Sequence, residues 1–398
     1  MRAIVIGAGI GGLCAAAGLC HAGWEVRLFE RAPALGEVGA GISLWANGLA
    51  ALATLGLREG VLDAARVPTV CEFRSDRGHR TLQAFRSDDL AAILGPSPIV
   101  VAHRAELVAA LARGLPPGVA KFGMTLAAVE PLAGNGERRG ATAIFADGTR
   151  ETADLLVSAD GLLSTVRRLC FSPDPPRYAG YTCWRGISTV PSGAAPAGYI
   201  AEWWSRGGAG TRVGLCALPP APGESAPRGE RFYWWVTTPA PPGGRAPDEQ
   251  REALRLLDGW AEPARAIVGA TPPDAVLRND ICDRPPLRTW RRGRVLLLGD
   301  AAHPTTPNLG QGAGMAIEDA AALARGLAGA GPDEVEPRLD AMVAGRRGRT
   351  SGVTAASNRL GWLGGLRSPV LGLIRDRAFA LAPRGVSLAM MMRYARPV

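Results

Sequence analysis

The order of apolar and small residues near the start of the chain predicts a strand, a helix and a second strand. Residues 3–6 form a short apolar run, residues 13–22 are mostly small, and residues 25–29 are again largely apolar. Short apolar runs suit strands, whereas the stretch between them suits a helix. We therefore expect a β-α-β unit at the beginning of the chain.

Two later apolar runs end in an acidic residue. Residues 153–158 lead into Asp160, and residues 295–298 lead into Asp300, after which a helical pattern covers residues 310–326. Strands that are apolar throughout and stop at Gly or Asp are typical of a parallel sheet that binds ligands at its carboxyl edge. Because these strands lie far from the first one in sequence, the predicted domain is assembled from separate segments.

The middle of the chain has a different pattern. Segments such as 211–219 and 231–238 alternate in the manner of antiparallel strands, and loops rich in Pro and Gly separate them. We expect an inserted antiparallel sheet with an aromatic-lined wall, although most of its tryptophans should lie in the core. The tryptophans of this part are Trp184, Trp203, Trp204, Trp234, Trp235 and Trp260.

These patterns predict an α/β protein with a Rossmann-like dinucleotide-binding domain, an inserted antiparallel β-sheet domain and C-terminal helices. Beyond residue 341 the chain is rich in Arg and then apolar with a helical pattern, which predicts helices packed over the domain junction; a role at a membrane surface is the alternative. The expected segments are 1–70, 98–178 and 280–345 for the nucleotide domain, 71–97 and 179–279 for the sheet domain, and 346–398 for the C-terminal helices.

A glycine motif joins the first predicted strand to the first helix. Residues 7–12 read GAGIGG, and Glu30 follows the second strand. In a β-α-β unit, Gly7 permits the tight turn, Gly9 lets the backbone approach a pyrophosphate, and Gly12 lets helix and strand pack closely. The helix N-terminus would face the phosphates, and Glu30 stands where a carboxylate accepts from ribose hydroxyls. The motif predicts a nucleotide site and leaves FAD and NAD open.

Composition narrows the function classes. The chain has 398 residues, enough for two domains, and a formal net charge of +9 carried almost wholly by arginine, because Lys121 is its only lysine. We expect the basic residues to be scattered, without the basic and aromatic stripe of a nucleic-acid binder. Seven cysteines without a C-x-x-C pair and four dispersed histidines suggest neither disulfides nor a metal site. A cytoplasmic protein without stable membrane association is the expectation.

Three motifs in order resemble those of the group A FAD-dependent aromatic monooxygenases, the flavoprotein hydroxylases. They are GAGIGG with Glu30 and Arg31, DG at residues 160–161 with Arg167, and GD at residues 299–300 running into HPTTPNLGQGAG. The resemblance covers about the first 345 residues. It implies bound FAD, reduction by NADH or NADPH, and O2 that forms a flavin C4a-hydroperoxide and hydroxylates a small aromatic or heteroaromatic substrate.

The resemblance also implies contacts to the cofactor. Arg104 matches a flavin-contacting arginine, and Asp160 lies in a motif used near the pyrophosphate and the pyridine nucleotide. Asp300 is implied to bond the ribityl chain, and Pro307 to place its carbonyl near the flavin ring. A helix N-terminus at residues 309–312 would stabilise the negative charge of reduced flavin. The implied cofactor-binding residues are Gly7, Gly9, Gly11, Gly12, Glu30, Arg31, Arg104, Asp160, Asp300, Gly310 and Gly312.

A narrower resemblance, carried by YAGYTCWRGI, TRVGLCALP and RFYWW, is to the urate hydroxylase-like and salicylate hydroxylase-like subgroup. It implies that Arg212 and Tyr233 lie beside the substrate. The subgroup has an aspartate where this chain has Asn308, an amide that can orient a substrate but cannot accept a proton as a carboxylate does. We therefore expect a substrate other than urate, with Arg212, Tyr233, Asn308 and Pro307 as catalytic candidates.

Several assignments stay open at this point. Arg185 is a second candidate for an anionic substrate group, and His303 is expected to be structural rather than a base. Tyr233, Trp234 and Trp235 alternate faces, so the sequence does not show which one points to the site. The alternatives to a hydroxylase are an epoxidase or Baeyer–Villiger-type enzyme acting on a polyketide-like product, and a flavin-binding accessory protein without turnover. We expect a monomer or a homodimer.

Overall fold

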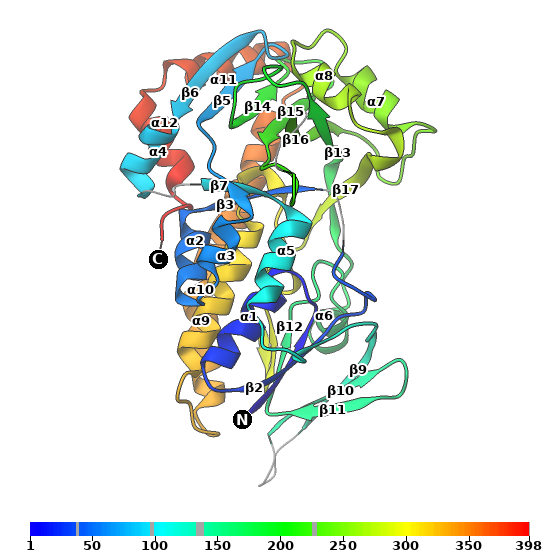
Figure 1. Ribbon diagram of the computed structural model, residues 1–398, viewed down its shortest axis with the longest axis vertical. Coiled ribbons are helices and arrows are strands. Elements are labelled where there is room, and N and C mark those ends of the chain that lie inside the picture. The colour runs from blue at the N-terminus through cyan, green and yellow to red at the C-terminus, as the bar shows by residue number, and fades with distance from the viewer. Residues whose placement is uncertain (37–39, 96–98, 133–138, 225–228, 398) are drawn as a thin grey trace.

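The computed structural model describes residues 1–36, 40–95, 99–132, 139–224 and 229–397. In Figure 1 the N-terminal strands lie in the lower half and a larger sheet lies in the upper half, with long helices running beside both. The two halves correspond to two separate hydrophobic cores, one around the first strands and one around the tryptophan-rich strands.

The lower sheet has six strands in the order β18-β19-β12-β1-β2-β8. β1 pairs in parallel with both β2 and β12, and β12 pairs in parallel with β19, as expected for apolar strands that end at Gly or Asp. The strands are β1 (Arg2–Ile6), β2 (Glu25–Phe29), β8 (Ala120–Lys121), β12 (Leu155–Ser158), β18 (Arg291–Arg292) and β19 (Val295–Leu297).

The lower sheet is covered on both faces. Helices α1 (Ile10–His21) and α9 (Gly312–Leu327) contact each other closely beside it. On the other side, the antiparallel sheet β11-β10-β9 packs through Phe145, whose ring centroid lies 4.6 Å from that of Phe29. α1 begins three residues earlier than the sequence pattern indicates, because its first turn includes Gly11 and Gly12. The β-α-β unit is confirmed.

The upper sheet has seven strands in the order β17-β13-β16-β15-β14-β5-β6. All neighbours are antiparallel except β14 and β5. Two strands from residues 70–86 thus join the strands of the inserted segment. The strands are β5 (Val70–Ser75), β6 (Arg80–Arg86), β13 (Arg177–Val190), β14 (Tyr199–Trp204), β15 (Arg212–Ala217), β16 (Glu230–Pro239) and β17 (Leu277–Asp283).

Four of the expected boundaries fall inside regular elements, including the one between residues 70 and 71, which lies in β5. Residue 179 lies within β13, residue 279 within β17, and residue 345 within helix α10 (Val335–Gly364). α10 is continuous because it serves both halves: Glu336 near its start pairs with Arg291 of the lower sheet, and Gly364 at its end packs on Arg212 of the upper sheet. A boundary drawn from composition misses this, because a helix can cross between domains without a change in residue types.

The tryptophans of the upper sheet lie mostly on its outer face. Trp184, Trp203 and Trp234 are at most 5% exposed and belong to the core formed with α7 (Glu249–Leu256) and α8 (Ala264–Gly269). Trp235 faces the other way, toward the lower half. The expectation that most tryptophans are core residues is therefore right, and the aromatic wall toward the site is narrower than the sequence suggested.

The remaining elements connect and flank the two sheets. A small sheet, β3-β7-β4, lies at their junction. None of the described helices is long and apolar enough to cross a membrane. Further elements are β3 (Gly41–Trp45), β4 (Ala65–Arg66), β7 (Ile99–His103), β9 (Leu126–Leu132), β10 (Gly140–Phe145), β11 (Arg150–Ala153), α2 (Ala46–Thr54), α3 (Arg58–Leu62), α4 (Ser87–Leu94), α5 (Arg104–Arg113), α6 (Thr165–Cys170), α11 (Pro369–Leu381) and α12 (Arg384–Met392).

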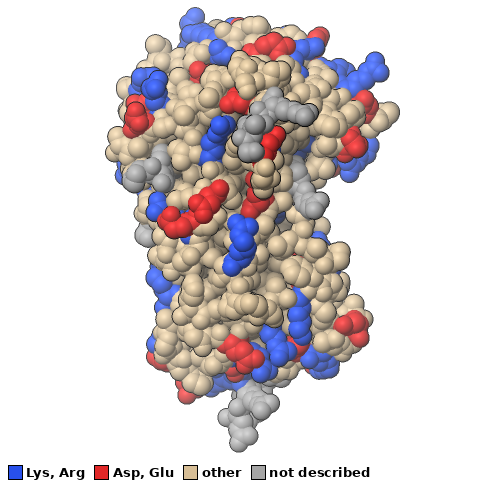
Figure 2. Space-filling view, in the orientation of Figure 1, with Lys and Arg blue, Asp and Glu red and all other residues tan. Residues whose placement is uncertain are grey.

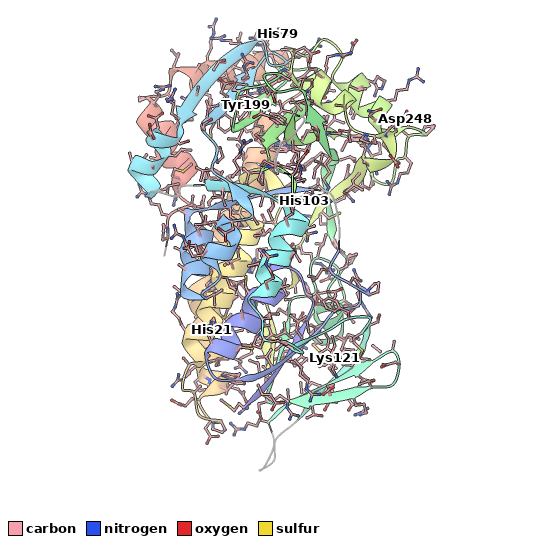
Figure 3. The ribbon with its side chains drawn as sticks, viewed as in Figure 1. His21, His79, His103, Lys121, Tyr199 and Asp248 are labelled. Atoms are coloured by element: carbon pink, nitrogen blue, oxygen red, sulfur yellow. The ribbon has the colours of Figure 1, made fainter. Side chains whose placement is uncertain are left out.

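The histidines are dispersed, as the sequence indicated. Figure 3 shows His21, His79 and His103 in different parts of the molecule, and the only lysine, Lys121, lies on the lower sheet. Within the described residues, no group of His, Cys, Asp and Glu has the arrangement of a metal site. Figure 2 shows acidic and basic side chains interspersed over the face it presents.

Candidate active site

The glycine turn after β1 is tightly packed on one side and open on the other. Gly7 has a φ of +102°, and a Cβ there would stand 2.6 Å from the carbonyl oxygen of Ala159. A Cβ at Gly12 would lie 1.8 Å from the carbonyl oxygen of Gly7, so the first turn of α1 needs glycine at this position. A Cβ at Gly9 would meet nothing within 4 Å. The turn therefore leaves space at Gly9, where a pyrophosphate fits.

Gly11 has a different environment from the other glycines of the motif. A Cβ at this position would lie 3.0 Å from Leu298 Cδ2 and 3.2 Å from the Cβ of Ala316. Its backbone thus faces the contact between α1, β19 and α9, where a side chain would force the elements apart. In this structure Gly11 permits close packing rather than offering an open surface.

Glu30 holds the glycine turn in place. One carboxylate oxygen accepts a hydrogen bond from the N–H of Ala8 at 2.8 Å, and the other accepts from the N–H of Ala32 at 2.9 Å. Each oxygen keeps a further lone pair, so ribose hydroxyls can still donate to it. Arg31 is exposed beside it.

Asp160 caps helix α6. Its Oδ2 accepts from the N–H groups of Thr165 at 2.7 Å and Val166 at 3.3 Å, and the hydroxyl of Ser158 donates to its other oxygen. This explains the acid at the end of β12: it satisfies the unpaired N–H groups at the start of the next helix. The cofactor contact that the motif resemblance implies for Asp160 stays a prediction, and its carboxylate also has this structural role.

Arg167 joins the turns after β12 and β19. Its Nη1 donates to the carbonyls of Ala301 and Ala302 at 3.1 and 3.0 Å, and the side chain is buried. Burial lowers the pKa of Arg167 to about 10, and the charge of Arg284 adds to the effect. Because this arginine ties α6 to the segment around Asp300, the second and third sequence motifs form one structural unit.

Asp300 lies in a short 3-10 turn, Gly299–Ala301, directly after β19. The turn requires glycine at residue 299, because its φ is +59° and a Cβ there would lie 2.9 Å from the Cβ of Ala316. Asp300 as a residue is exposed to solvent, although protein atoms surround its carboxyl group. Desolvation of the carboxyl group raises the pKa of Asp300, while the charges of His303 and Arg104 oppose that rise. Asp300 thus offers an accessible hydrogen-bond acceptor, which suits the ribityl hydroxyls of FAD.

Arg104 stands at the first position of α5, where its N–H donates to the carbonyl of Ala40 at 2.8 Å. Burial and then the charge of Arg185 lower the pKa of Arg104, whereas Asp300 raises it. Arg104 therefore lies within electrostatic range of an acid from the lower sheet and of a base from the upper sheet. This places it at the junction of the two halves.

The segment from Pro307 to Gly312 forms the start of α9. Pro307 opens a 3-10 turn, Gly310 follows with a φ of +61°, and α9 begins at Gly312. A Cβ at Gly310 would lie 3.3 Å from Nε1 of Trp45, a buried donor without a hydrogen-bond partner among the described residues. The helix start expected near residue 310 is confirmed, and the bare backbone beside an unpaired donor suits contact with a flat, polar ring.

The inner face of the upper sheet carries the substrate candidates. Tyr233 and Trp235 both face the lower half, with ring centroids 5.4 Å apart, while Trp234 points into the outer core. A Cβ at Gly41 would lie 2.4 Å from Cγ of Tyr233, so the small sheet closes against this ring. Burial raises the pKa of Tyr233, and Arg185 opposes the rise. The structure thus selects Tyr233 and Trp235 among the three aromatic residues.

The two arginines of this face differ in their partners. Arg212 is 5% exposed, its Nη1 lies 3.4 Å from Oε1 of Glu202, and its guanidinium lies over the ring of Tyr181. Arg185 has a buried Nε without a hydrogen-bond partner, and no ion pair joins it to a described carboxylate. The subgroup resemblance implied Arg212 beside the substrate and Arg185 as the weaker candidate; the pairing of Arg212 with Glu202 of the neighbouring strand is not visible in the motif.

Asn308 is held by the protein rather than presented freely. Its Nδ2 donates to Oγ1 of Thr306 and to the carbonyl of Ser357, both at 3.0 Å, and its Oδ1 accepts from the hydroxyl of Tyr181 at 3.2 Å. Together with Arg212 it lines a cavity of about 380 Å³ between β13, β16 and α10. The other residues of this cavity include Tyr178, Thr237, Asp283, Asn358, Gly361 and Trp362.

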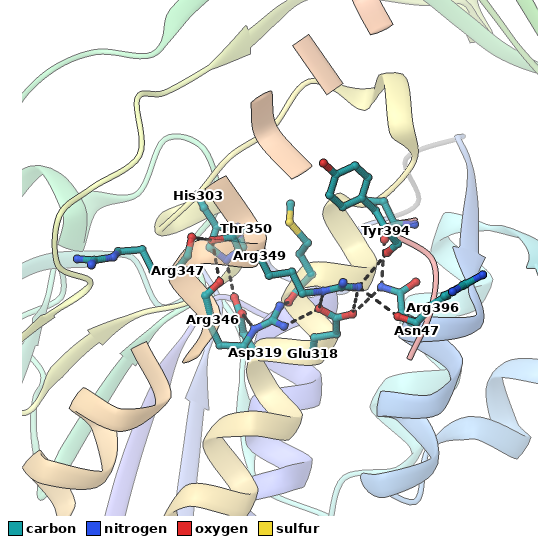
Figure 4. Close-up of polar contacts among 12 residues, drawn as sticks. Asn47, His303, Glu318, Asp319, Arg346, Arg347, Arg349, Thr350, Tyr394 and Arg396 are labelled. Atoms are coloured by element: carbon teal, nitrogen blue, oxygen red, sulfur yellow. Dashed lines mark hydrogen bonds and ion pairs between the residues drawn. The ribbon is translucent and has the colours of Figure 1, made fainter. Parts of the chain in front are cut away.

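His303 belongs to a buried charged network behind α9 (Figure 4). Its Nε2 lies 2.5 Å from Oδ2 of Asp319, and Arg346 Nε donates to the other oxygen of Asp319 at 2.7 Å. Burial opposes ionisation of Asp319, but His303 and Arg346 outweigh it and hold its pKa below the ordinary value. His303 is therefore structural, as expected.

Comparison with known proteins gives the class of protein that this fold and site define. Residues 1–357 match the family described as FAD binding domain, and the chain belongs to that family. It is 37% identical over 385 residues to an aurachin C monooxygenase/isomerase of Stigmatella aurantiaca, covering 95% of this chain and 93% of the relative. It is 35% identical over 358 residues to an FAD-dependent urate hydroxylase of Mycolicibacterium vanbaalenii, covering 88% and 85%.

A solved structure shares the whole fold. The structure of Klebsiella pneumoniae HpxO complexed with FAD and uric acid matches with a TM-score of 0.86 and 30% identity, covering 99% of this chain and 96% of that chain. Within the family, the protein is a member of the FAD-dependent aromatic monooxygenase group. The residues described above fit FAD, since Gly9 is open, Asp300 is accessible, and the start of α9 carries bare backbone.

Proposed function

We propose that this protein is a single-component monooxygenase that uses FAD, NADH or NADPH, and O2 to hydroxylate a small aromatic or heteroaromatic substrate. The observation that supports it is the meeting of two sets of side chains. Arg104 and Asp300 come from the FAD-binding half, and Arg185 and Tyr233 come from the upper sheet. The charges of Arg185 and Asp300 both act on Arg104, the first lowering and the second raising its pKa, which supports a shared space between the two halves.

When bound, FAD would supply the redox chemistry that connects oxidation of NADH or NADPH to reduction of O2, with one oxygen atom entering the substrate and the other leaving as water. The protein then has to bind, orient and exclude water. Gly9 and the N-terminus of α1 would hold the pyrophosphate, Glu30 the ribose, and Asp300 the ribityl chain. The N–H groups at the start of α9 would stabilise negative charge on the reduced ring.

The substrate class follows from the charges on the inner face of the upper sheet. Arg212 is neutralised by Glu202, whereas Arg185 has no described carboxylate partner. A half-buried cation without a carboxylate partner favours a ligand with a carboxylate or an ionised ring oxygen. The uric acid bound by the related K. pneumoniae protein is an acidic heteroaromatic compound, which agrees with this class. We propose an anionic phenol or heteroaromatic acid, oriented by Arg185 and Tyr233.

A second candidate is oxygenation followed by rearrangement of the product, which includes epoxidase or Baeyer–Villiger-type chemistry. The relative named as a monooxygenase/isomerase, 37% identical over most of both chains, supports this candidate. Both candidates need the same FAD site, and they differ in what happens to the substrate skeleton after oxygen transfer.

The test is oxidation of NADH and NADPH by the FAD-loaded protein with a panel of phenolic and heteroaromatic acids, measured together with hydrogen peroxide. We expect at least one compound to accelerate flavin reduction and to give a hydroxylated product that matches the reduced nucleotide consumed. A product with a changed ring skeleton would favour the second candidate. If no compound accelerates flavin reduction, the hydroxylase proposal fails and a binding role without turnover gains support.

The FAD site has its own test. Asp300→Ala removes the proposed ribityl acceptor, and we expect FAD binding to weaken about tenfold or more, since hydrogen bonds to a charged group contribute about 1.5–3 kcal/mol. Fluorescence titration of the apoprotein with FAD measures the effect. Unchanged affinity would refute the assignment of Asp300.

A further inference from the structure

The positive charge of the chain is concentrated in its C-terminal segment. Residues 341–398 contain ten arginines and a single acidic residue, Asp376, which gives this segment a formal net charge of +9. The whole chain has the same net charge, so residues 1–340 are neutral overall. Part of this charge is balanced inside the protein, because Arg346 and Arg349 pair with Glu318 and Asp319 of α9. Helices α11 and α12, which belong to this segment, lie at the upper left in Figure 1.

Helix α11 directs its charged pair toward the protein. Arg375 and Asp376 are 4% and 0% exposed, and Nη2 of Arg375 lies 2.7 Å from Oδ1 of Asp376. Gly372 lies on the same face, where a Cβ would stand 2.1 Å from the carbonyl oxygen of Arg206. Phe379 completes this face with a ring centroid 5.3 Å from that of Phe73. This side of α11, which carries the charged pair, is thus buried against the upper sheet.

The opposite side of α11 is apolar and faces solvent. Val370, Leu371, Ile374 and Leu381 are 67%, 48%, 58% and 81% exposed, and Ala378 between them is also exposed. Their spacing of one, four, eight and eleven positions from the first residue places them on one side of an α-helix. We call these five residues the α11 stripe. Such a contiguous apolar surface marks a site of interaction.

Arginine is the only exposed charged residue type in the segment that carries the stripe. Arg377 lies within the stripe's side of α11, and Arg359, Arg367 and Arg384 are exposed before and after it. Asp376, the one acidic residue of residues 341–398, is buried. The segment therefore offers a partner apolar groups and positive charge, without any exposed carboxylate among its described residues.

We propose that the α11 stripe is an interfacial docking surface for an anionic lipid bilayer. An amphipathic helix that lies in the plane of a membrane buries its apolar side at the headgroup boundary and places arginine against anionic headgroups. A second copy of this chain fits the stripe less well, because a two-fold contact sets the same surface against itself and opposes arginine with arginine. Charge complementarity thus selects the lipid surface.

The docking surface adjoins the cavity described above. Trp362, near the end of α10 and before α11, is 69% exposed and lines the cavity together with Asn308 and Arg212. A substrate dissolved in the bilayer would thereby reach the upper sheet from the docked side. This last step rests on the proposed function, whereas membrane docking does not.

Co-sedimentation of the FAD-loaded full-length protein with vesicles tests the proposal. One set consists of phosphatidylcholine, and the other is an equal mixture of phosphatidylcholine and phosphatidylglycerol. We expect binding to the anionic vesicles, about tenfold weaker binding without phosphatidylglycerol, and a decrease as salt is raised, because salt screens surface charge. Absence of binding to the anionic vesicles would overturn the proposal.

Two matched double variants separate the stripe from apolar surface in general. Ile374→Ser with Leu381→Ser should weaken binding to the anionic vesicles about tenfold or more, since two exposed apolar side chains lose their burial. Leu163→Ser with Leu169→Ser changes two exposed leucines of the lower half, 64% and 43% exposed, and should leave binding unchanged. Equal losses in the two double variants would contradict the proposal.

Sedimentation velocity without vesicles tests whether a second copy of the chain, rather than a membrane, covers the α11 stripe. We expect the same assembly state for the natural chain and for Ile374→Ser with Leu381→Ser. A dimer that this double variant converts to a monomer would assign the stripe to a second copy of the chain instead, and would overturn membrane docking.

Discussion

Arg212 and Glu202 form a largely buried ion pair across the neighbouring strands β15 and β14, with Nη1 of the arginine 3.4 Å from Oε1 of the glutamate. Nε1 of Trp204 donates to the same carboxylate oxygen at 3.0 Å. The arginine that the motif places beside the substrate therefore has its charge balanced within the sheet. The uncompensated positive charge on this face belongs to Arg185, two strands away.

Arg212→Ala should destabilise the protein more than it impairs substrate binding. The change leaves Glu202, whose side chain is 16% exposed, without its cation, and we expect the free energy of unfolding to fall by about 3 kcal/mol. Urea unfolding measures this loss. Arg212→Met combined with Glu202→Gln removes both charges and should recover at least half of it. If the double variant is no more stable than the single one, the ion pair is not the source of the effect.

Arg185→Gln should raise KM for an anionic substrate about tenfold to a hundredfold, because a hydrogen bond to a charged group contributes about 1.5–3 kcal/mol. The free energy of unfolding should change little, since no described carboxylate loses its partner. Steady-state kinetics with an anionic substrate and a neutral analogue measures the effect.

Arg185→Lys is the control for the loss of charge at this position. It keeps the positive charge and should retain much of the affinity lost in Arg185→Gln. Equal changes in KM for the anionic and the neutral compound would show that Arg185 does not recognise the substrate's charge.

Gly9→Ala and Gly12→Ala should separate cofactor binding from folding. Gly9 has a φ of −75° and open space around it, so alanine fits the free protein but intrudes where the pyrophosphate is expected. Gly12→Ala places a methyl group 1.8 Å from the carbonyl oxygen of Gly7 and should destabilise the fold. FAD titration and thermal unfolding of both variants check the pair. A Gly9→Ala protein that binds FAD with unchanged affinity would place the pyrophosphate elsewhere.

Asp319 should make stability fall in acid. Its folded-state pKa lies below the ordinary value of about 3.9 because His303 and Arg346 favour the carboxylate over the opposing effect of burial. A lowered folded-state pKa means that the contribution is fully present above about pH 4 and is lost as the pH falls through the folded-state pKa. Urea unfolding from about pH 6 downward, compared between the natural chain and Asp319→Asn, measures it.

The Asp319→Asn variant should be less stable at neutral pH and should show a shallower decline in acid. A matched comparison is Asp63→Asn, which changes an aspartate outside the network. An acid decline that is equally steep in the natural chain and in Asp319→Asn would show that other carboxylates dominate.

Local sequence signals predicted much of the lower half. The tight spacing of Gly7, Gly9 and Gly12 allows one turn, and strands that are apolar throughout require a sheet covered on both faces. The start of α9 follows a turn at Gly310, whose φ of +61° favours glycine. These features depend on residues adjacent in the chain, so local sequence was sufficient for a dinucleotide site and the β-α-β unit, whereas FAD rather than NAD was implied only by the family resemblance.

Tertiary structure decided what depends on partners distant in sequence. Neighbouring strands determine that Arg212 is paired and Arg185 is not, and the pleat determines that Tyr233 and Trp235 face the site while Trp234 does not. Packing of α11 through Arg375 and Asp376 leaves its apolar side outward, which a helical pattern alone does not reveal. Composition and local pattern record which residues are present, whereas burial and pairing arise only when separate segments meet in the folded chain.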